Sequence, residues 1–429
     1  MSPRDSPGPA PRGRGRRLRP RHERALAAFD HGNGTFRYYT QRYSTAVDNP
    51  FHYGSAVSGE RFTDRARELK VLVTCMTHGQ NAVLLSPRRY GKTSLLKRAA
   101  EVAGESGARV GMANLVQCST RREVAEELAT AIARSLTSKF GAKLDELRRY
   151  LADLSPSFSI EAHGVKVSLA PGTPESDWTN EVKSALRSLN RRRVRKEPVA
   201  LIIDEFQRTV EINQGLPGIF KAMVDELERV SLVFAGSRRH LMEELSNSPG
   251  APLLGIGQRI NLLPIGPDEM IPFLIERAAT GSKRLSRDVA SLIYERANGV
   301  PNHVQQLAFW TYTEADAELD LAAVDRAMAT VLSLSVVDFI EATEKISPVQ
   351  QRLLRSLAGK PAKDLFSKRF VDITGVSNPS GVGRALRRLE DLELIELGPN
   401  GWRVANPFLA RWLQVGSDAE LIDEGDPAE

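Results

Sequence analysis

The 429-residue sequence lacks the features of disulfide-bonded, secreted and membrane-spanning proteins. Its two cysteines, Cys75 and Cys118, lie in or beside apolar segments, so we expect neither a disulfide framework nor a cysteine metal site. No stretch approaches about 18 consecutive apolar residues, and no apolar signal-peptide region follows the basic N-terminus. We therefore expect a cytoplasmic protein with no membrane partner, long enough for about two to three domains.

The formal net charge of +6 is unevenly distributed along the chain. Residues 1–24 contain eight arginines and two acids, whereas residues 416–429 contain six acids and no base. Both ends are predicted to be disordered, and the first is either a nucleic-acid-binding arm or a solvated tail. Within the body, residues 347–413 contain eleven Lys or Arg against six Asp or Glu, so positive charge is concentrated near the C-terminus.

Residues 81–98, NAVLLSPRRYGKTSLLKR, have the pattern of an apolar strand, a tight turn and the start of a helix. This is the layout of a phosphate-binding loop, in which backbone N–H groups at a helix N-terminus cradle the phosphates of a nucleotide. Lys92 is predicted to reach the β- and γ-phosphates and Thr93 to ligate Mg²⁺. The predicted nucleotide contacts are Ser86, Pro87, Arg88, Arg89, Tyr90, Gly91, Lys92, Thr93 and Ser94.

Two further apolar runs end in polar residues suited to phosphate chemistry. Residues 199–203 form a near-continuous apolar run, typical of a buried parallel strand, and end in Asp204 and Glu205. Asp204 is predicted to hold the Mg²⁺ shell and Glu205 to polarise the attacking water. Residues 232–235 are followed by Gly236 and Ser237, which places a hydroxyl near the γ-phosphate if the strands are parallel.

The alternation of apolar runs predicts a parallel sheet covered on both faces, an α/β fold. Helices are expected at about 63–77, 92–103 and 120–138, strands at 82–86 and 108–116, and a hairpin at 157–170. Further helices at about 268–279, 286–297, 301–316 and 322–333 indicate a helical lid behind the sheet.

The C-terminal region has the pattern of a winged helix-turn-helix. A helix beginning at Ser347, a short helix near 363–371 and a helix at 379–392 precede two short strands at 394–397 and 402–404. The third helix offers Arg384, Arg387 and Arg388 to double-stranded DNA. Winged helices also dock proteins, and acidic residues close the same helix, so DNA and a protein partner both remain open.

Together these pieces resemble a known family. The residues are Phe62-Thr63-Asp64-Arg65, SPRRYGKTSLL, LIIDEF, FAGSRR, Gly299-Val300-Pro301 and NPFLARWL. They resemble the archaeal-type ATPases of the STAND and AAA+ superfamily, P-loop proteins with a helical lid and a C-terminal winged helix. The resemblance implies that Arg65 borders the adenine side, that Pro301 lies beside the base, and that Ser237 senses the γ-phosphate. Arg259 falls where the family often has a basic residue. It is either an arginine finger across a subunit interface of a homo-oligomer or a surface arginine.

Two positions depart from the pattern of this family. Asp64 stands where Gly is common, and Ser86 replaces the first glycine of the loop. Because serine lacks the freedom of glycine at positive φ, we expect a slightly reshaped loop.

The sequence thus predicts an AAA+-like P-loop ATPase that uses ATP and Mg²⁺ as a nucleotide-dependent switch. The alternatives are a DNA-binding winged-helix protein in which ATP is structural, and a partner-docking protein of regulation or defence. The predicted organisation is a tail (1–24), an extension (25–60), an α/β domain (61–265), a lid (266–340), a winged helix (345–414) and an acidic tail (415–429).

Overall fold

The computed structural model describes residues 25–30, 35–40, 49–57, 63, 65–137, 158–160, 165–191, 197–366, 370–372, 379–398 and 400–423. Predictions for the arginine-rich tail, for Asp64 and for the tip of the 157–170 hairpin lie outside these residues. The chain divides into two units, Met1–Asp48 and Asn49–Glu429. In the first, β1 (Ala25–Asp30) and β2 (Thr35–Thr40) pair as an antiparallel hairpin that the sequence did not suggest.

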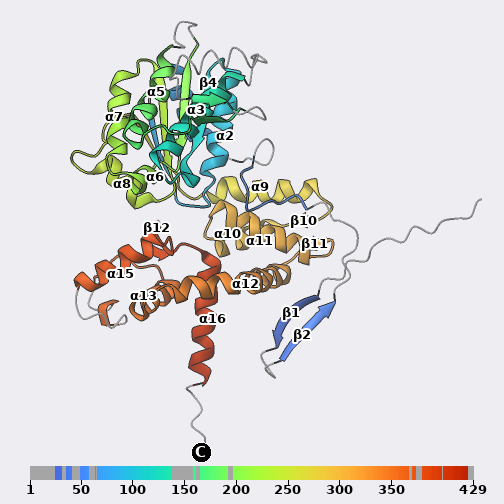
Figure 1. Ribbon diagram of the computed structural model, residues 1–429. Helices are drawn as coiled ribbons and strands as arrows, with labels where there is room; N and C mark the ends of the chain where they lie inside the picture. The colour runs from blue at the N-terminus through green and yellow to red at the C-terminus, as the bar shows by residue number, and fades with distance from the viewer. Residues whose placement is uncertain are drawn as a thin grey trace, which may run out of the picture. The chain divides into compact units, whose positions relative to one another are not determined.

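Five parallel strands form the sheet of the second unit, in the order β4-β7-β8-β3-β9. Figure 1 shows this sheet with helices on both sides. These are β3 (Ala82–Leu85), β4 (Arg109–Asn114), β7 (Val199–Asp204), β8 (Val230–Gly236) and β9 (Gln258–Asn261). Every residue of β3, β7 and β8 is buried, as the continuous apolar runs predicted.

Helices cover both faces of this sheet, and the side chains of each strand alternate between them. In β7, Ala200 and Ile202 pack with α1 (Ala66–His78) and α2 (Lys92–Glu105). Leu201 and Ile203 face the other side. That side is covered by α3 (Arg121–Thr137), α5 (Trp178–Arg191), α6 (Arg208–Ile212), α7 (Leu216–Glu226) and α8 (Arg239–Asn247). The predicted α/β class is therefore confirmed.

The helical region that follows the sheet packs around one core with the C-terminal module. Its helices are α9 (Pro267–Thr280), α10 (Arg287–Arg296), α11 (Pro301–Glu314) and α12 (Leu321–Glu344). Helix α12 is 24 residues long and extends well beyond the predicted end at 333. It contains neither Gly nor Pro, and Phe339 near its C-terminus is 4% exposed and packs against Trp412, so tertiary contacts carry the helix onward.

The C-terminal module has the first and third helices and the wing of the predicted winged helix, and the predicted short helix near 363–371 lies partly outside the described residues. It contains α13 (Pro348–Gly359), α15 (Pro379–Asp391), the hairpin of β12 (Ile395–Gly398) and β13 (Gly401–Val404), and α16 (Pro407–Asp423). Helix α16 continues past residue 415 into the segment predicted to be a disordered tail. Among the described residues, no helix is long and apolar enough to cross a membrane.

Candidate functional site

The predicted phosphate-binding residues meet at the carboxyl edge of the sheet. Strand β8 lies between β3 and β7, so the loop after β3, the acids that end β7 and Ser237 after β8 are neighbours. The N–H group of Ser86 donates to the carbonyl of Gly236 at 3.3 Å, which ties the start of the loop to the end of β8. Parallel sheets bind ligands at this edge, where strand ends converge.

The loop backbone bends at Arg89 and Gly91 rather than at Ser86. Arg89 has φ +70° and Gly91 has φ +85°, both in the left-handed region, whereas Ser86 has no positive φ. The glycine position that the sequence lacks therefore needs no glycine in this chain, and serine fits it without backbone strain. A Cβ atom added at Gly91 would meet no atom within 4 Å, so the loop is open in front of the N-terminus of α2.

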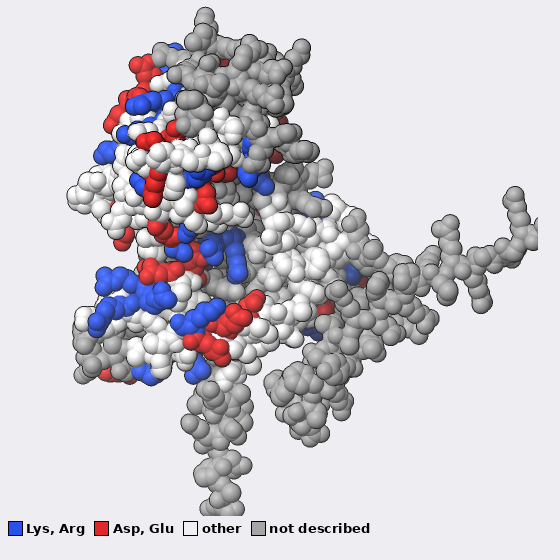
Figure 2. Space-filling model, viewed as in Figure 1, with Lys and Arg blue, Asp and Glu red and all other residues white. Residues whose placement is uncertain are grey.

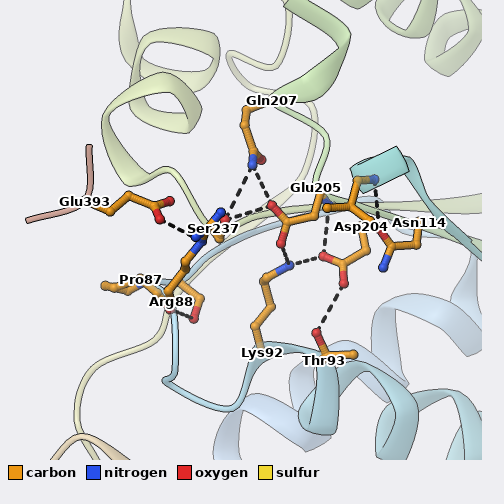
Figure 3. Close-up of polar contacts among 12 residues, drawn as sticks. Pro87, Arg88, Lys92, Thr93, Asn114, Asp204, Glu205, Gln207, Ser237 and Glu393 are labelled. Carbon is orange, nitrogen blue, oxygen red and sulfur yellow. Dashed lines mark hydrogen bonds and ion pairs between the residues drawn. The ribbon is translucent and has the colours of Figure 1, made fainter. Parts of the chain in front are cut away.

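Lys92 joins the loop to both predicted acids (Figure 3). Its ammonium donates to Oδ1 of Asp204 and, at 2.7 Å, to Oε1 of Glu205. The side chains of Lys92 and Asp204 are 7% and 1% exposed, so this is a buried charge cluster. Two carboxylates against one ammonium leave a negative charge that a second cation would compensate.

Thr93 and Asp204 have the chemistry of a magnesium site. Thr93 Oγ1 lies 3.3 Å from Oδ2 of Asp204, which places a hydroxyl and a carboxylate together at the start of α2 (Figure 3). Hard oxygen ligands of this kind suit Mg²⁺. Among the residues that the structure describes, no group of three His, Cys, Asp or Glu could hold a metal alone. Thr93 and Asp204 could supply two oxygen ligands, with phosphate oxygens and water as the others.

Glu205 is held by donors on both of its oxygens. Ser237 Oγ donates to Oε2 at 2.7 Å, and the amide of Gln207 donates to the same oxygen at 2.6 Å. Burial raises the pKa of Glu205, but the charge of Lys92 and the hydrogen bonds from Lys92, Gln207 and Ser237 outweigh it, so the pKa is lowered. Glu205 is therefore ionised at neutral pH.

A cavity of about 340 Å³ lies in front of the loop. Its walls include the loop residues 87–94, Ser237, Pro301 and the segment 54–57. The N–H group of Val57 donates to the hydroxyl of Ser94 at 3.0 Å, which fixes that segment against α2. This volume is within the range of small-molecule sites.

Arg65 lines this cavity but is also a structural anchor. It is 5% exposed, and its guanidinium donates to the carbonyl oxygens of Tyr90 at 3.3 Å and Leu263 at 2.6 Å. Arg65 therefore ties the loop, through Tyr90, to the segment that follows β9. Arg259 lies apart from the cluster around Lys92, on β9, where its guanidinium contacts Asn247 and lies 3.7 Å from Glu243 of α8.

Three consecutive loop residues contact the lid or the winged helix. Arg88 forms an ion pair with Glu393 at 2.7 Å (Figure 3). The carbonyl oxygen of Arg89 accepts from the N–H group of Asn302 at 3.2 Å, and its guanidinium lies 3.4 Å from His303. The loop is thus joined to the first turn of α11 and to Glu393, two residues after the end of α15.

Tyr90 connects the loop to the wing. Its hydroxyl donates to Glu396 of β12 at 2.8 Å and lies 3.0 Å from a guanidinium nitrogen of Arg403 on β13. Glu396 and Arg403 also pair with each other at 2.7 Å and are 11% and 13% exposed. Burial, and then the charge of Glu396, raise the pKa of Tyr90, so the phenol remains a donor at physiological pH.

His303 lies between the loop and the last helix. It is 1% exposed, and its ring packs edge-to-face on Phe408 of α16, with centroids 5.1 Å apart. Burial and the charge of Arg89 lower the pKa of His303 to about 3, so the imidazole is neutral. Figure 2 shows a hollow with mixed charge between the sheet domain and the winged helix, and His303, Arg88 and Glu393 line the cavity of about 790 Å³ there.

The predicted DNA residues lie on the surface, away from the loop. Arg384, Arg387 and Arg388 are all exposed on α15. Figure 2 shows Lys and Arg gathered over the part of the winged helix that carries this helix. The C-terminal end of the same helix turns toward the sheet domain, since Asp391 lies 2.9 Å from His240 of α8.

Of the residues that the sequence did not indicate, Gln207 contacts the cluster around Glu205 and the others join the modules. Gln207, His303, Glu393, Glu396 and Arg403 carry no recognisable motif, and their partners lie between 2 and more than 300 residues away in the chain. Only Gln207, two positions after Glu205, could have been found from spacing, because a side chain at that distance can reach the same strand end.

Comparison with known proteins supports the fold and the family. A family model of ATPase domains predominantly from Archaea matches residues 62–307, and a model of a probable winged helix domain matches residues 337–415. None of the curated protein sequences compared with the chain matches it.

Solved structures share the architecture at low sequence identity. The Walker-type ATPase PABY2304 of Pyrococcus abyssi is 18% identical over 85% of this chain and 99% of its own, with a TM-score of 0.61. The ORC1 protein of Aeropyrum pernix in complex with DNA is 16% identical over 85% and 95%, with a TM-score of 0.45. Cdc6p from Pyrobaculum aerophilum is 15% identical over 88% and 99%, also at 0.45. The first of these supports the fold.

Proposed function

Because the chain belongs to the family of ATPase domains found predominantly in Archaea, we propose that it binds Mg-ATP at residues 86–94 and hydrolyses it slowly as a switch. The winged helix is the output of this switch. The observation that carries the proposal is the contact of Arg88, Arg89 and Tyr90 with both other modules, because any ligand that moves the loop must also act on these contacts.

In this proposal each side chain of the cluster has one task. Lys92 and the N-terminus of α2 bind the β- and γ-phosphates, and Thr93 and Asp204 hold Mg²⁺. When bound, Mg²⁺ supplies positive charge that offsets the charge of the phosphates. Glu205 accepts a proton from water as the water oxygen bonds to the γ-phosphorus, and the bond to the bridging oxygen breaks, so ADP leaves with that electron pair.

Binding of a triphosphate also changes the partners of the loop cations. Lys92 exchanges its carboxylate contacts for phosphate oxygens, and Arg88 is drawn from Glu393 toward the same charge. Weakening of the pair between Arg88 and Glu393 loosens the winged helix, and by reciprocity a docked winged helix weakens ATP binding. The nucleotide therefore acts on the winged helix because its phosphates compete with the carboxylate of Glu393 for Arg88.

The test is ATP binding and steady-state hydrolysis by the full chain, with Lys92→Ala as the blank. Glu205→Gln keeps ATP affinity but should lose turnover about 100-fold or more, since general-base catalysis contributes on that scale. Glu101→Gln, an exposed change on α2, serves as the matched control. Turnover of Glu205→Gln equal to the parent would place the base elsewhere, and turnover of the parent equal to the blank would refute the hydrolysis.

A second candidate, favoured by the exposed arginines of α15, is a DNA-binding protein in which ATP is structural. It predicts duplex binding that weakens in Arg384→Ala and is unchanged by Lys92→Ala. Stimulation of hydrolysis by duplex DNA would instead unite the two candidates. A protein partner in place of DNA predicts no duplex affinity in either variant.

A further inference from the structure

The amide of Gln207 is enclosed next to the proposed general base. Gln207 follows Asp204-Glu205-Phe206 at the start of α6 and is 2% exposed. Its Nε2 lies 2.6 Å from Oε2 of Glu205 and 3.5 Å from the hydroxyl of Ser237 (Figure 3). Its other end, Oε1, is buried without a hydrogen-bond partner. The side chain of Gln207 therefore acts as a hydrogen-bond donor and not as an acceptor.

The surroundings leave this amide no room to turn away. A Cβ atom added at Gly236 would lie 2.4 Å from Oε1 of Gln207, so the backbone of β8 closes directly over the amide. Close packing of this kind in a protein interior restricts the rotamers of a side chain. The position of the donor relative to Glu205 is therefore set by the sheet.

The backbone of Glu205 is in a conformation that glutamate does not favour by itself, so the surroundings must hold this residue. It has φ +58°, in the left-handed region that non-glycine residues adopt only when the surroundings impose it. The two donors to Oε2 are the amide of Gln207 and the hydroxyl of Ser237, while Oε1 faces Lys92.

We propose that Gln207 is a positioning residue for Glu205, holding Oε2 so that Oε1 is the oxygen that accepts the proton of water, an inference that rests on the proposed hydrolysis. Lys92 occupies Oε1 in the structure and leaves it when its ammonium moves to the phosphates. The two donors on Oε2 remain, so the carboxylate keeps its orientation while one oxygen becomes available.

The test compares kcat and the ATP Kd in the parent, in Gln207→Met and in Gln207→Glu. The methionine variant keeps the length of the side chain but has no donor. Its kcat should fall roughly tenfold or more, with the ATP Kd changed less than about twofold. The glutamate variant keeps the shape of the side chain but presents a second carboxylate to Glu205, so its kcat should fall at least as far, again with little change in the ATP Kd.

Gln351→Met is the matched control, because it removes a glutamine hydrogen bond to the carbonyl of Thr343, far along the chain in α13. A purely structural role for Gln207 predicts a lower melting temperature with kcat per folded protein equal to that of the parent, and that result overturns the inference. If the methionine variant does not fold, the glutamate variant gives the test, since an unchanged kcat there also overturns the inference. Hydrolysis by the parent no faster than by Lys92→Ala refutes the proposed function itself, which separates the two failures.

Discussion

Lys92 should be a structural residue as well as a phosphate ligand, and Lys92→Met tests this. Its ammonium is buried between Asp204 and Glu205, whose side chains are 1% and 17% exposed. Removal of one partner of a buried ion pair costs about 3–5 kcal/mol, because it leaves uncompensated charge in the interior. For a domain of this size, about 3 kcal/mol corresponds to a fall in Tm of roughly 6–12 °C.

The loss of Tm in Lys92→Met should depend on pH, and its direction follows from the pKa of Glu205. In the parent, the folded-state pKa of Glu205 is lowered below the ordinary value of 4.5, so its contribution to stability is present above that pH and is lost as the pH falls through the folded pKa. In Lys92→Met the two carboxylates repel instead, and protonation relieves them. The deficit in Tm should therefore be largest near pH 7.5 and should shrink toward pH 4.

Thermal unfolding followed by circular dichroism, in buffer without nucleotide and with EDTA, measures the effect. Lys97→Met is the matched control, since Lys97 lies on the same helix and is exposed. Adding Asp204→Asn to Lys92→Met should recover part of the lost stability. If Lys92→Met melts within about 1 °C of Lys97→Met at pH 7.5, the buried cluster contributes little and the reasoning is refuted.

Three further predictions concern the contacts of the loop and of α15. Glu393→Gln should tighten ATP binding about two- to fivefold, because it frees Arg88 from a partly exposed ion pair, and unchanged affinity by calorimetry would contradict the competition. Tyr90→Phe and Glu396→Gln should show a coupling of about 1.5–3 kcal/mol in a double-mutant cycle on unfolding, and additive effects would mean that the wing is not docked in solution. Arg387→Ala should reduce the slope of log K for duplex binding against log salt by about 0.9, whereas an unchanged slope excludes a phosphate contact.

The sheet and its phosphate-binding edge could be predicted because their signals are local. An apolar run that ends in Asp204 and Glu205 specifies both a buried strand and the position of its carboxyl end. The loop around Lys92 likewise combines strand, turn and helix signals within a few residues. These residues were predicted to meet because the carboxyl ends of parallel strands converge.

The contacts between modules could not be predicted, because no local pattern encodes them. Nothing near Tyr90 indicates Glu396, and their pairing depends on the packing of a wing more than 300 residues away. The bend at Arg89 shows the same limit. Arg89 has a left-handed φ that its residue type does not favour, and its carbonyl oxygen accepts a hydrogen bond from Asn302, more than 200 residues away. Ser86 itself has no positive φ, whereas Arg89 and Gly91 do, and the reshaping expected from the missing glycine stays a prediction.

Helix α12 is long enough for a small rotation at one end to become a large displacement at the other, next to the winged helix. At about 1.5 Å per residue, its 24 residues span roughly 36 Å without a glycine or proline at which to bend. A turn of a few degrees at its N-terminal end would displace its C-terminal end by about 2–3 Å, enough to break a hydrogen bond outright. Bending would then be limited to the segments on either side of the helix, 315–320 and 345–347. Substitutions that stiffen these segments should reduce the proposed response of the winged helix without changing ATP binding or hydrolysis.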